Sequence, residues 1–272
     1  MSRILFRIVA AAAFVVLAAA VPTSALADSN PAGGSGGSAS QGGWKAAHDS
    51  DPHAPIINVG PHHQGVAPSH QGVAAPLTVP SDFVIGTNQQ GQQTSYWCGP
   101  AAVSEAIGLL GYVYSQGTEA SLLKTTTGGT AWSGVNANVP AQFQTGYPVR
   151  DVIDYEWWAN NGYSPGYVVV GLPYTPSQTD INNYKSNITY DLSNWWPVVS
   201  DAWEVAGYPH LTGHPHNQTI YHWFTTIGYG NYGNQTDYED SATTVWSTVP
   251  AYTYGFDTPT MVGILGGRGY VW

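Results

Sequence analysis

Cysteine is nearly absent from this sequence, since Cys98 is the only one among 272 residues. A single cysteine cannot form an internal disulfide, so a fold stapled by disulfides is excluded. Two interpretations of the thiol remain. It is either buried and inert, because free cysteine is among the most buried residue types, or it is kept for its reactivity.

Long apolar runs are missing as well, apart from one at the N-terminus. Arg3 and Arg7 give a positive start, the run from Ile8 to Val21 is apolar, and Ala25 to Ala27 offers the small residues of a signal-peptidase site. A membrane anchor is the alternative, but the run is too short to span comfortably and no second hydrophobic segment follows. We therefore predict a cleaved signal peptide at residues 1–27, and a secreted, extracellular protein with no membrane anchor after cleavage.

Charged residues are scarce, and basic ones above all. Charged side chains make up 9% of the chain, with 7 basic and 17 acidic residues. Loss of Arg3 and Arg7 with the signal peptide leaves 5 basic residues against 17 acidic ones, a balance of −12. Such a protein repels phosphate groups, so we expect neither nucleic acid nor an anionic membrane surface as a partner.

Residues 28–80 have the composition of a linker or pro-segment. The segment is rich in Gly, Ser and Pro, and the sequence HQGVA occurs at His63 and again at His70. No apolar pattern is long enough to bury a face, so we predict disorder. The histidines of this segment could bind a transition metal loosely, but nothing rigid would hold them at set distances; we predict no metal site and no cofactor.

Residues 81–272 form the predicted folded domain, and its first half carries helix signals. The helix that begins near Cys98 should stop at Gly111, Thr118 can cap a short helix, and Thr175 with Pro176 opens another. A helix over Trp132–Val139 is a weaker prediction, because Pro140 ends it early.

The second half carries strand signals. The runs Tyr167–Val170, Pro197–Val205 and Tyr221–Tyr229 are rich in β-branched and aromatic residues, and a turn-rich segment joins the last of them to Thr236–Trp246. A short helix is expected after Thr258. Helices followed by an antiparallel sheet indicate an α+β fold, with the helix of Cys98 packed on the sheet.

Cys98 stands where a thiolate is favoured. It directly precedes a run with helical spacing in which Pro100 fits the first turn, so the thiol should lie at a helix N-terminus. Unpaired backbone N–H groups and the positive end of the helix dipole stabilise an anion at such a place.

A catalytic thiolate also needs a base, a group that orients the base, and donors for the oxyanion. His222 begins the strongest predicted strand. Pairing about the following turn places residues whose numbers sum to roughly 462 to 464 opposite one another, which brings Asp240 within cross-strand or diagonal reach of the imidazole. Asp237 is the weaker candidate. For the oxyanion we expect the amide of Gln92, six residues before Cys98, with Gln93 as the alternative.

The segments QQTSYWCGPAA from Gln92, HWFTTIGY from His222 and YEDS around Asp240 resemble the bacteriocin-processing peptidases, family thirty-nine of the cysteine peptidases. The resemblance implies a papain-like fold. It also implies roles: Cys98 as nucleophile, His222 as general base and acid, Asp240 as its orienting group, and Gln92 as the oxyanion donor. The chain departs from those family members that are fused to a transporter with an ATPase, which puts leader cleavage in doubt.

A second group of histidines, His210, His214 and His216, precedes the strong strand in the loop PHLTGHPH. These residues could ligate a metal or replace His222 as the base. A structural loop is the favoured interpretation, because no cysteine and no well-placed carboxylate is expected to complete a ligand set.

The sequence thus predicts a secreted papain-like cysteine peptidase that acts on a peptide or protein substrate. One rival is a cysteine amidohydrolase that cuts peptidoglycan. The other is a catalytically silent domain that binds carbohydrate or a cell surface, since its Trp, Tyr and Asn content suits such a role.

Overall fold

A computed structural model of the chain describes residues 78–272. The signal peptide predicted at 1–27 and nearly all of the linker predicted at 28–80 lie outside the described residues. The elements in chain order are β1 (Phe83–Val84), α2 (Cys98–Leu109), α3 (Gln116–Leu123), η2 (Ala141–Phe143), α4 (Pro148–Asn161), β2 (Val169–Gly171), α5 (Gln178–Ser193), β3 (Val198–Glu204), β4 (Ile220–Gly230), η3 (Asn231–Gly233), β5 (Gln235–Glu239), η4 (Ser241–Thr244), β6 (Tyr252–Asp257), α6 (Thr258–Leu265) and β7 (Gly269–Val271).

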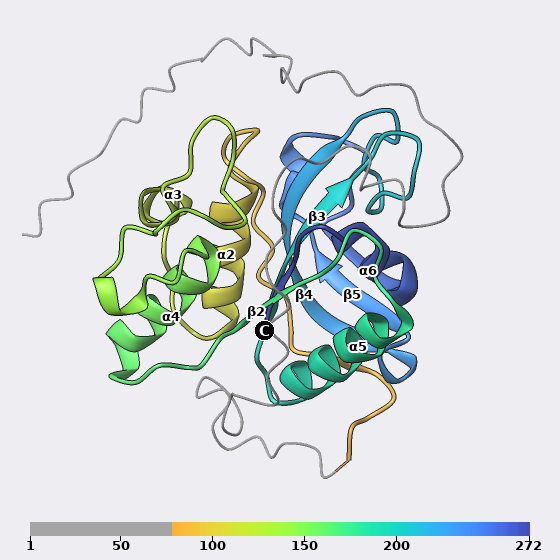
Figure 1. Ribbon diagram of the computed structural model, residues 1–272, viewed down its shortest axis with the longest axis horizontal. Coiled ribbons are helices and arrows are strands. Elements are labelled where there is room, and N and C mark those ends of the chain that lie inside the picture. The colour runs from red at the N-terminus through yellow and green to blue at the C-terminus, as the bar shows by residue number, and fades with distance from the viewer. Residues whose placement is uncertain (1–77) are drawn as a thin grey trace, which may run out of the picture. The chain divides into compact units, whose positions relative to one another are not determined.

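The strands form one antiparallel sheet in the order β2-β7-β3-β4-β5-β6, and β1 adds to the far end of β4. Two apolar clusters cover its faces. One packs α2, α3 and α4 against residues such as Val199 and Trp223. The other packs α5 and α6 against residues such as Phe224 and Tyr270. Figure 1 shows α2 to α4 gathered on one side of the sheet and α5 and α6 on the other. The α+β prediction, with the helix of Cys98 packed on an antiparallel sheet, is confirmed.

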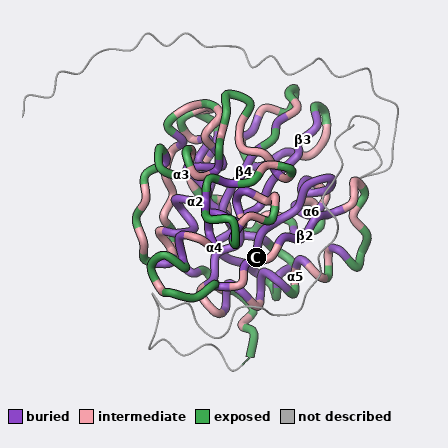
Figure 2. The backbone as a smooth tube through the Cα atoms, turned by 60° about the vertical axis from the view of Figure 1, so that its left-hand side comes forward, coloured by how far each residue is buried: buried purple, intermediate pink, exposed green. Residues whose placement is uncertain are grey.

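Helix α2 is the central helix of its layer. Every residue from Cys98 to Ile107 is buried, and Figure 2 shows buried segments through α2 and the sheet, with exposed residues concentrated in the loops. The single O–H of Thr225 on β4 is shared between two acceptors on α2, the carbonyl of Ala102 at 3.1 Å and Glu105 Oε2 at 3.0 Å. These two bonds fix the rotation of α2 on β4, and therefore the position of its first residue.

Helix α4 was not predicted, although its end signals are present. Pro148 stands at its start, and Gly162, at φ 77°, takes the left-handed conformation that ends a helix. Val152, Ile153 and Trp157 are fully buried on its inner face.

Three helix predictions need correction. The cap of α3 is Ser115, whose hydroxyl accepts from the Thr118 N–H at 3.1 Å, so Thr118 is inside the helix. Helix α5 begins after a capping box made by Ser177 rather than at Thr175. The segment Trp132–Val139 is not helical, since it turns at Gly134, whose φ is +80°. The expected helix at Thr258 is confirmed.

The hairpin of β4 and β5 follows the predicted register at its start and then shifts. Thr225 pairs with Glu239, a sum of 464, but an irregularity between Thr226 and Gly228 moves the later pairs to 465. Strand β5 ends at Glu239 rather than at Trp246, because Asp240 caps the short helix η4.

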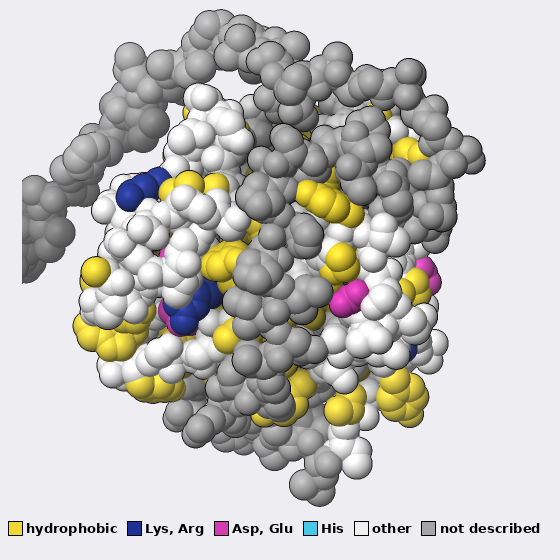
Figure 3. Space-filling model, in the orientation of Figure 1, with side chains coloured by type: hydrophobic (Ala, Val, Ile, Leu, Met, Phe, Trp, Pro, Cys, Tyr) yellow, Lys and Arg dark blue, Asp and Glu magenta, His cyan; other side chains and the backbone are white. Residues whose placement is uncertain are grey.

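The surface matches the composition. Among the described residues visible in Figure 3, few side chains are charged and the apolar ones are scattered. Among the described residues, no helix combines the length and hydropathy needed to cross a membrane.

Candidate active site

The structure brings the thiol of Cys98 and the imidazole of His222 together. Cys98 is the first residue of α2, and His222 lies on β4 three residues before Thr225, the residue that ties β4 to α2. The thiol is near enough to His222 to raise the pKa of its imidazole. Both are buried, with 7% of Cys98 and 3% of His222 exposed, so the interaction is shielded from water.

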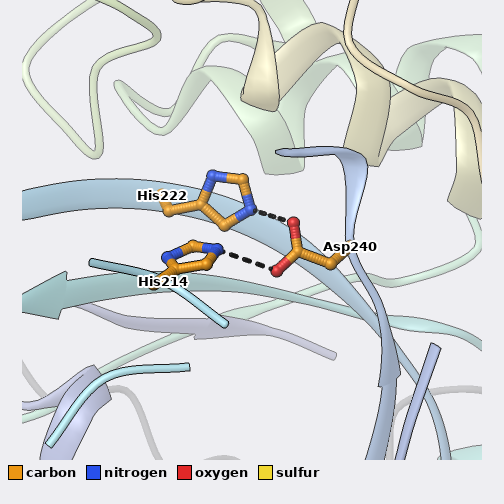
Figure 4. A group of neighbouring side chains, drawn as sticks. All are labelled: His214, His222 and Asp240. Atoms are coloured by element: carbon orange, nitrogen blue, oxygen red, sulfur yellow. Dashed lines mark hydrogen bonds and ion pairs between the residues drawn. The ribbon is translucent and has the colours of Figure 1, made fainter. Parts of the chain in front are cut away.

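Asp240 lies on the other side of the imidazole. Its Oδ1 atom is 2.9 Å from Nε2 of His222. The dashed line between the two side chains in Figure 4 marks this bond. Because Nε2 is engaged by the carboxylate, Nδ1 is the ring nitrogen left for the thiol. The cross-strand argument had placed Asp240 within reach of His222, and the two side chains do meet.

The Asp240 carboxylate is held at several points. Oδ1 also accepts the N–H of Ala242 at 2.8 Å, which makes Asp240 the cap of η4. Its main-chain N–H donates to Ala251, and its carbonyl accepts from the side chain of Gln89 at 2.7 Å. An aspartate with its backbone and side chain both bonded keeps one orientation.

Burial and charge act in opposite directions on this pair. Burial alone would lower the pKa of His222, but the charge of Asp240 and hydrogen bonds to Asp240 and Cys98 outweigh it and hold the pKa well above 6.5. Burial alone would raise the pKa of Asp240, yet the charge of His222 and hydrogen bonds from His214 and His222 hold it well below 3.8. The favoured state is an imidazolium beside a carboxylate.

His214 contacts the same aspartate. Its Nε2 atom lies 3.1 Å from Asp240 Oδ2, and its Nδ1 atom lies 2.9 Å from Oε1 and 3.0 Å from Oε2 of Glu204. Figure 4 shows the two histidine rings turned toward the two oxygens of Asp240. The expectation that no well-placed carboxylate lies near this loop was wrong: Glu204 and Asp240 both bond His214.

The other two histidines of that loop play no part in this contact. Both ring nitrogens of His210 lie against main-chain carbonyls, those of Tyr208 at 2.7 Å and Gln218 at 2.8 Å. His216 is exposed and its ring lies 4.8 Å from that of His210.

The donor atoms of His214, His222 and Asp240 all lie within 4.8 Å of one another, a set that a transition metal accepts. Their N–O separations of 2.9 and 3.1 Å are those of direct hydrogen bonds.

Gln92 is buried beside the site, whereas Gln93 is exposed. The main-chain N–H of Gln92 donates to Ser241 at 2.9 Å, and its carbonyl accepts from Thr244 at 2.7 Å, which ties this segment to η4 directly after Asp240. One side-chain N–H goes to the carbonyl of Thr94 at 2.8 Å. A primary amide has two N–H groups, so the second is available to a ligand.

Two buried carboxylates hold the segment that leads to Gln92. Glu239 accepts the N–H of Asn88 at 2.8 Å, and Glu105 accepts the N–H of Gln90 at 2.9 Å. Burial raises the pKa of Glu239 to about 7, and burial together with the charge of Glu239 raises that of Glu105 well above 4.5. Both carboxyl groups therefore keep their protons to a higher pH than an exposed glutamate does.

Asp237, the weaker aspartate candidate, lies elsewhere. It pairs with Gly228 at the shifted end of the hairpin, and its carboxylate accepts the N–H of Gly255 at 2.7 Å. The one-residue irregularity in β4 is what moved it from the predicted partners Thr225 to Ile227.

No family model matches the chain, and no curated protein matches it. The resemblance to the bacteriocin-processing peptidases thus stays a prediction. Among solved structures, the chain is similar to a digestive procathepsin L2 proteinase from the larval midgut of Tenebrio molitor, with 15% sequence identity over 79% of this chain and 76% of the other, at a TM-score of 0.37. At this distance the likeness carries no conclusion about this chain.

Proposed function

We propose that this chain is a secreted, papain-like cysteine peptidase that hydrolyses peptide bonds through Cys98, His222, Asp240 and Gln92. The observation that carries the proposal is the position of His222: its Nε2 bonds Asp240, and the thiol at the start of α2 is near enough to raise the pKa of its imidazole.

The helix start supplies part of the chemistry. The first N–H groups of a helix have no partner inside the helix, and Pro100 has no N–H, so the donors nearest the thiol are those of Cys98 and Gly99. These donors and the helix dipole favour a thiolate next to the imidazolium. The ion pair is the resting form that the proposal requires.

In the first half of the reaction the Cys98 sulfur attacks the carbonyl carbon of the substrate. The oxyanion that forms accepts from the Cys98 N–H and from the second side-chain N–H of Gln92. His222 then transfers its Nδ1 proton to the leaving amine as the C–N bond breaks, and the acyl group stays on sulfur.

In the second half a water molecule gives its proton to His222 and attacks the thioester. Collapse of the second tetrahedral intermediate releases the acid and restores the thiolate and the imidazolium. Asp240 keeps the ring in the orientation that both proton transfers need.

The proposal is tested by incubating the mature wild type and Cys98→Ala with a diverse peptide library and reading the products by mass spectrometry. We expect cleavage by the wild type, loss of at least about 1,000-fold in the variant, and an unchanged circular dichroism spectrum. Retained cleavage by Cys98→Ala would contradict the assignment. Clearing of a cell-wall suspension without cleavage of any library peptide would favour the amidohydrolase instead.

Secretion is a separate part of the proposal and rests on the sequence of residues 1–27. Expression of the full chain in an exporting bacterial host should yield a medium fraction whose N-terminus begins at Asp28. An intact N-terminus on protein that stays in the membrane fraction would contradict it.

A further inference from the structure

A second buried acid-base pair, His214 and Glu204, lies behind the proposed triad and has no part in its chemistry. We propose that this pair is a positioning device, which holds Asp240 in the one orientation that keeps His222 aligned with the Cys98 thiol. The inference rests on the function proposed above, because it assigns the pair to the same site.

The two oxygens of Asp240 are divided between two histidines. Oδ1 bonds His222 at 2.9 Å and the Ala242 N–H at 2.8 Å, whereas Oδ2 bonds His214 at 3.1 Å. Asp240 is only 1% exposed, so water cannot replace His214 freely. Removal of His214 would leave a buried carboxylate oxygen without its donor, and the carboxylate could rotate away from His222.

His214 is itself fixed from behind. Its Nδ1 atom contacts both oxygens of Glu204, which is fully buried at the end of β3. Its ring packs on that of Trp246, with centroids 5.0 Å apart. These contacts with Glu204 and Trp246 restrict the orientation of the His214 ring.

Charge supports the same assignment. Bonds from both ring nitrogens to carboxylates require a proton on each nitrogen, and the bonds to Asp240 and Glu204 raise the pKa of His214 above 6.5 against the lowering effect of burial. Acidic and basic side chains alternate along the series Glu204, His214, Asp240 and His222. Each basic group has an acidic neighbour, which is the condition for burying such a series.

The test uses Cys98 alkylation, because the chain has one cysteine and the readout needs no substrate. The rate of iodoacetamide modification at pH 6 is measured on the folded mature chain by intact mass. We expect His214→Gln to slow modification by about 10- to 100-fold, the loss that follows removal of a buried hydrogen bond to a charged group. Circular dichroism and urea unfolding verify that the variants fold.

The matched control is His210→Gln. His210 is also buried, lies in the same loop and approaches Glu204 to 3.8 Å, but its ring nitrogens bond main-chain carbonyls. We expect its alkylation rate to stay within about twofold of the wild type. Equal losses in His210→Gln and His214→Gln would assign the effect to the loop as a whole and overturn the positioning role.

A double-mutant cycle separates positioning from general stability. If His214 acts through Asp240, then His214→Gln should change the rate by less than about twofold once Asp240→Ala is present. A loss that is the same in both backgrounds would overturn the proposal. Should His214→Gln not fold, Glu204→Gln keeps an acceptor for Nδ1 without its charge, and a fall of about three- to tenfold is expected.

The outcomes also distinguish this inference from the proposed function. If the wild type cleaves no peptide but its alkylation depends on His214, the peptidase function is contradicted and the positioning role of His214 and Glu204 is supported. If the wild type cleaves peptides but His214→Gln is alkylated like His210→Gln, the positioning role is contradicted and the peptidase function is supported. Protection of Cys98 by equimolar Zn²⁺ that is lost in His214→Gln would assign the cluster to a metal and overturn the positioning role.

Discussion

The pair Glu119 and Glu156 predicts that this domain loses stability as the pH rises. The two carboxyl groups lie in α3 and α4, and at most 1% of either residue is exposed. Burial and the charge of Glu156 raise the pKa of Glu119 to about 10. Burial raises the pKa of Glu156 to about 8. The ordinary value is 4.5 for both.

The direction follows from which state holds the protons. Below about pH 4.5 the folded and unfolded chains are both protonated, and ionisation costs nothing. Above that value the unfolded chain releases protons that the folded chain retains, and the free energy of unfolding falls by about 1.4 kcal/mol for each pH unit and each proton. For Glu156 the fall ends near pH 8, and for Glu119 near pH 10.

The substitution Glu119→Gln keeps the shape of the side chain and removes one of the two carboxyl groups whose ionisation lowers the stability. The difference in free energy of unfolding between the variant and the wild type should shift in favour of the variant by up to about 3 kcal/mol from pH 5 to pH 7. If the helices relax around the ionised pair, this shift should still be at least about 1 kcal/mol. Urea unfolding followed by tryptophan fluorescence at pH 5, 6 and 7 measures it.

Asp82→Asn is the control for Glu119→Gln. Asp82 is exposed, and hydrogen bonds from Ser81 and Asn231 lower its pKa from 3.8, so it is charged in both states throughout this range. The free energy of unfolding of Asp82→Asn should change with pH in parallel with that of the wild type. If the free energies of unfolding of Glu119→Gln and the wild type change in parallel with pH as well, Glu119 does not have the raised pKa in the folded chain.

Three further predictions concern single positions. Gly99→Ala should slow alkylation of Cys98 and cost about 1–3 kcal/mol in urea unfolding, because its Cβ would meet the side chain of Thr130. An unchanged alkylation rate together with an unchanged free energy of unfolding would contradict this close approach. Gly213→Ala should destabilise the domain by at least about 1 kcal/mol, because the φ of this residue is +81° and an added Cβ would meet the carbonyl of Thr248. An unchanged free energy of unfolding would contradict that contact. Ser177→Ala removes the capping box of α5 and should cost about 0.5–2 kcal/mol by urea unfolding; no measurable cost would mean that the cap is unimportant.

Local signals in the sequence were sufficient for part of the fold and part of the candidate site. Pro100 and the apolar spacing behind Cys98 located the start of α2, and the aromatic run from Tyr221 located β4. The turn after β4 gave a register close enough to bring Asp240 to His222, since the shift in pairing lies on the turn side of Thr226.

Long-range pairings could not be obtained from local patterns. Glu204 reaches His214 because β3 pairs with β4 over its whole length, with Glu204 opposite Ile220. Nothing in the loop PHLTGHPH itself indicates a carboxylate partner, so His214 was assigned a structural role. Gly213 and Thr248 illustrate the same limit, since their contact joins segments 35 residues apart.

Buried carboxylates are the other reason that the prediction was incomplete. Glutamate is usually exposed, yet Glu105, Glu119, Glu156, Glu204 and Glu239 are all buried. The apolar face of α4 cannot be recognised in PVRDVIDYEWWANN, because the charged residues Asp151, Asp154 and Glu156 are buried together with the apolar ones. A hydrophobicity pattern counts such residues as exposed and therefore fails at this helix.

The central claim, that the thiol of Cys98 performs hydrolysis, is tested most directly by titration with iodoacetamide. On a peptide that the wild type cleaves, residual activity is plotted against the fraction of Cys98 alkylated, determined by intact mass on the same samples. We predict a straight line that reaches zero activity at one adduct per chain. Measurable cleavage by fully alkylated protein would contradict the account.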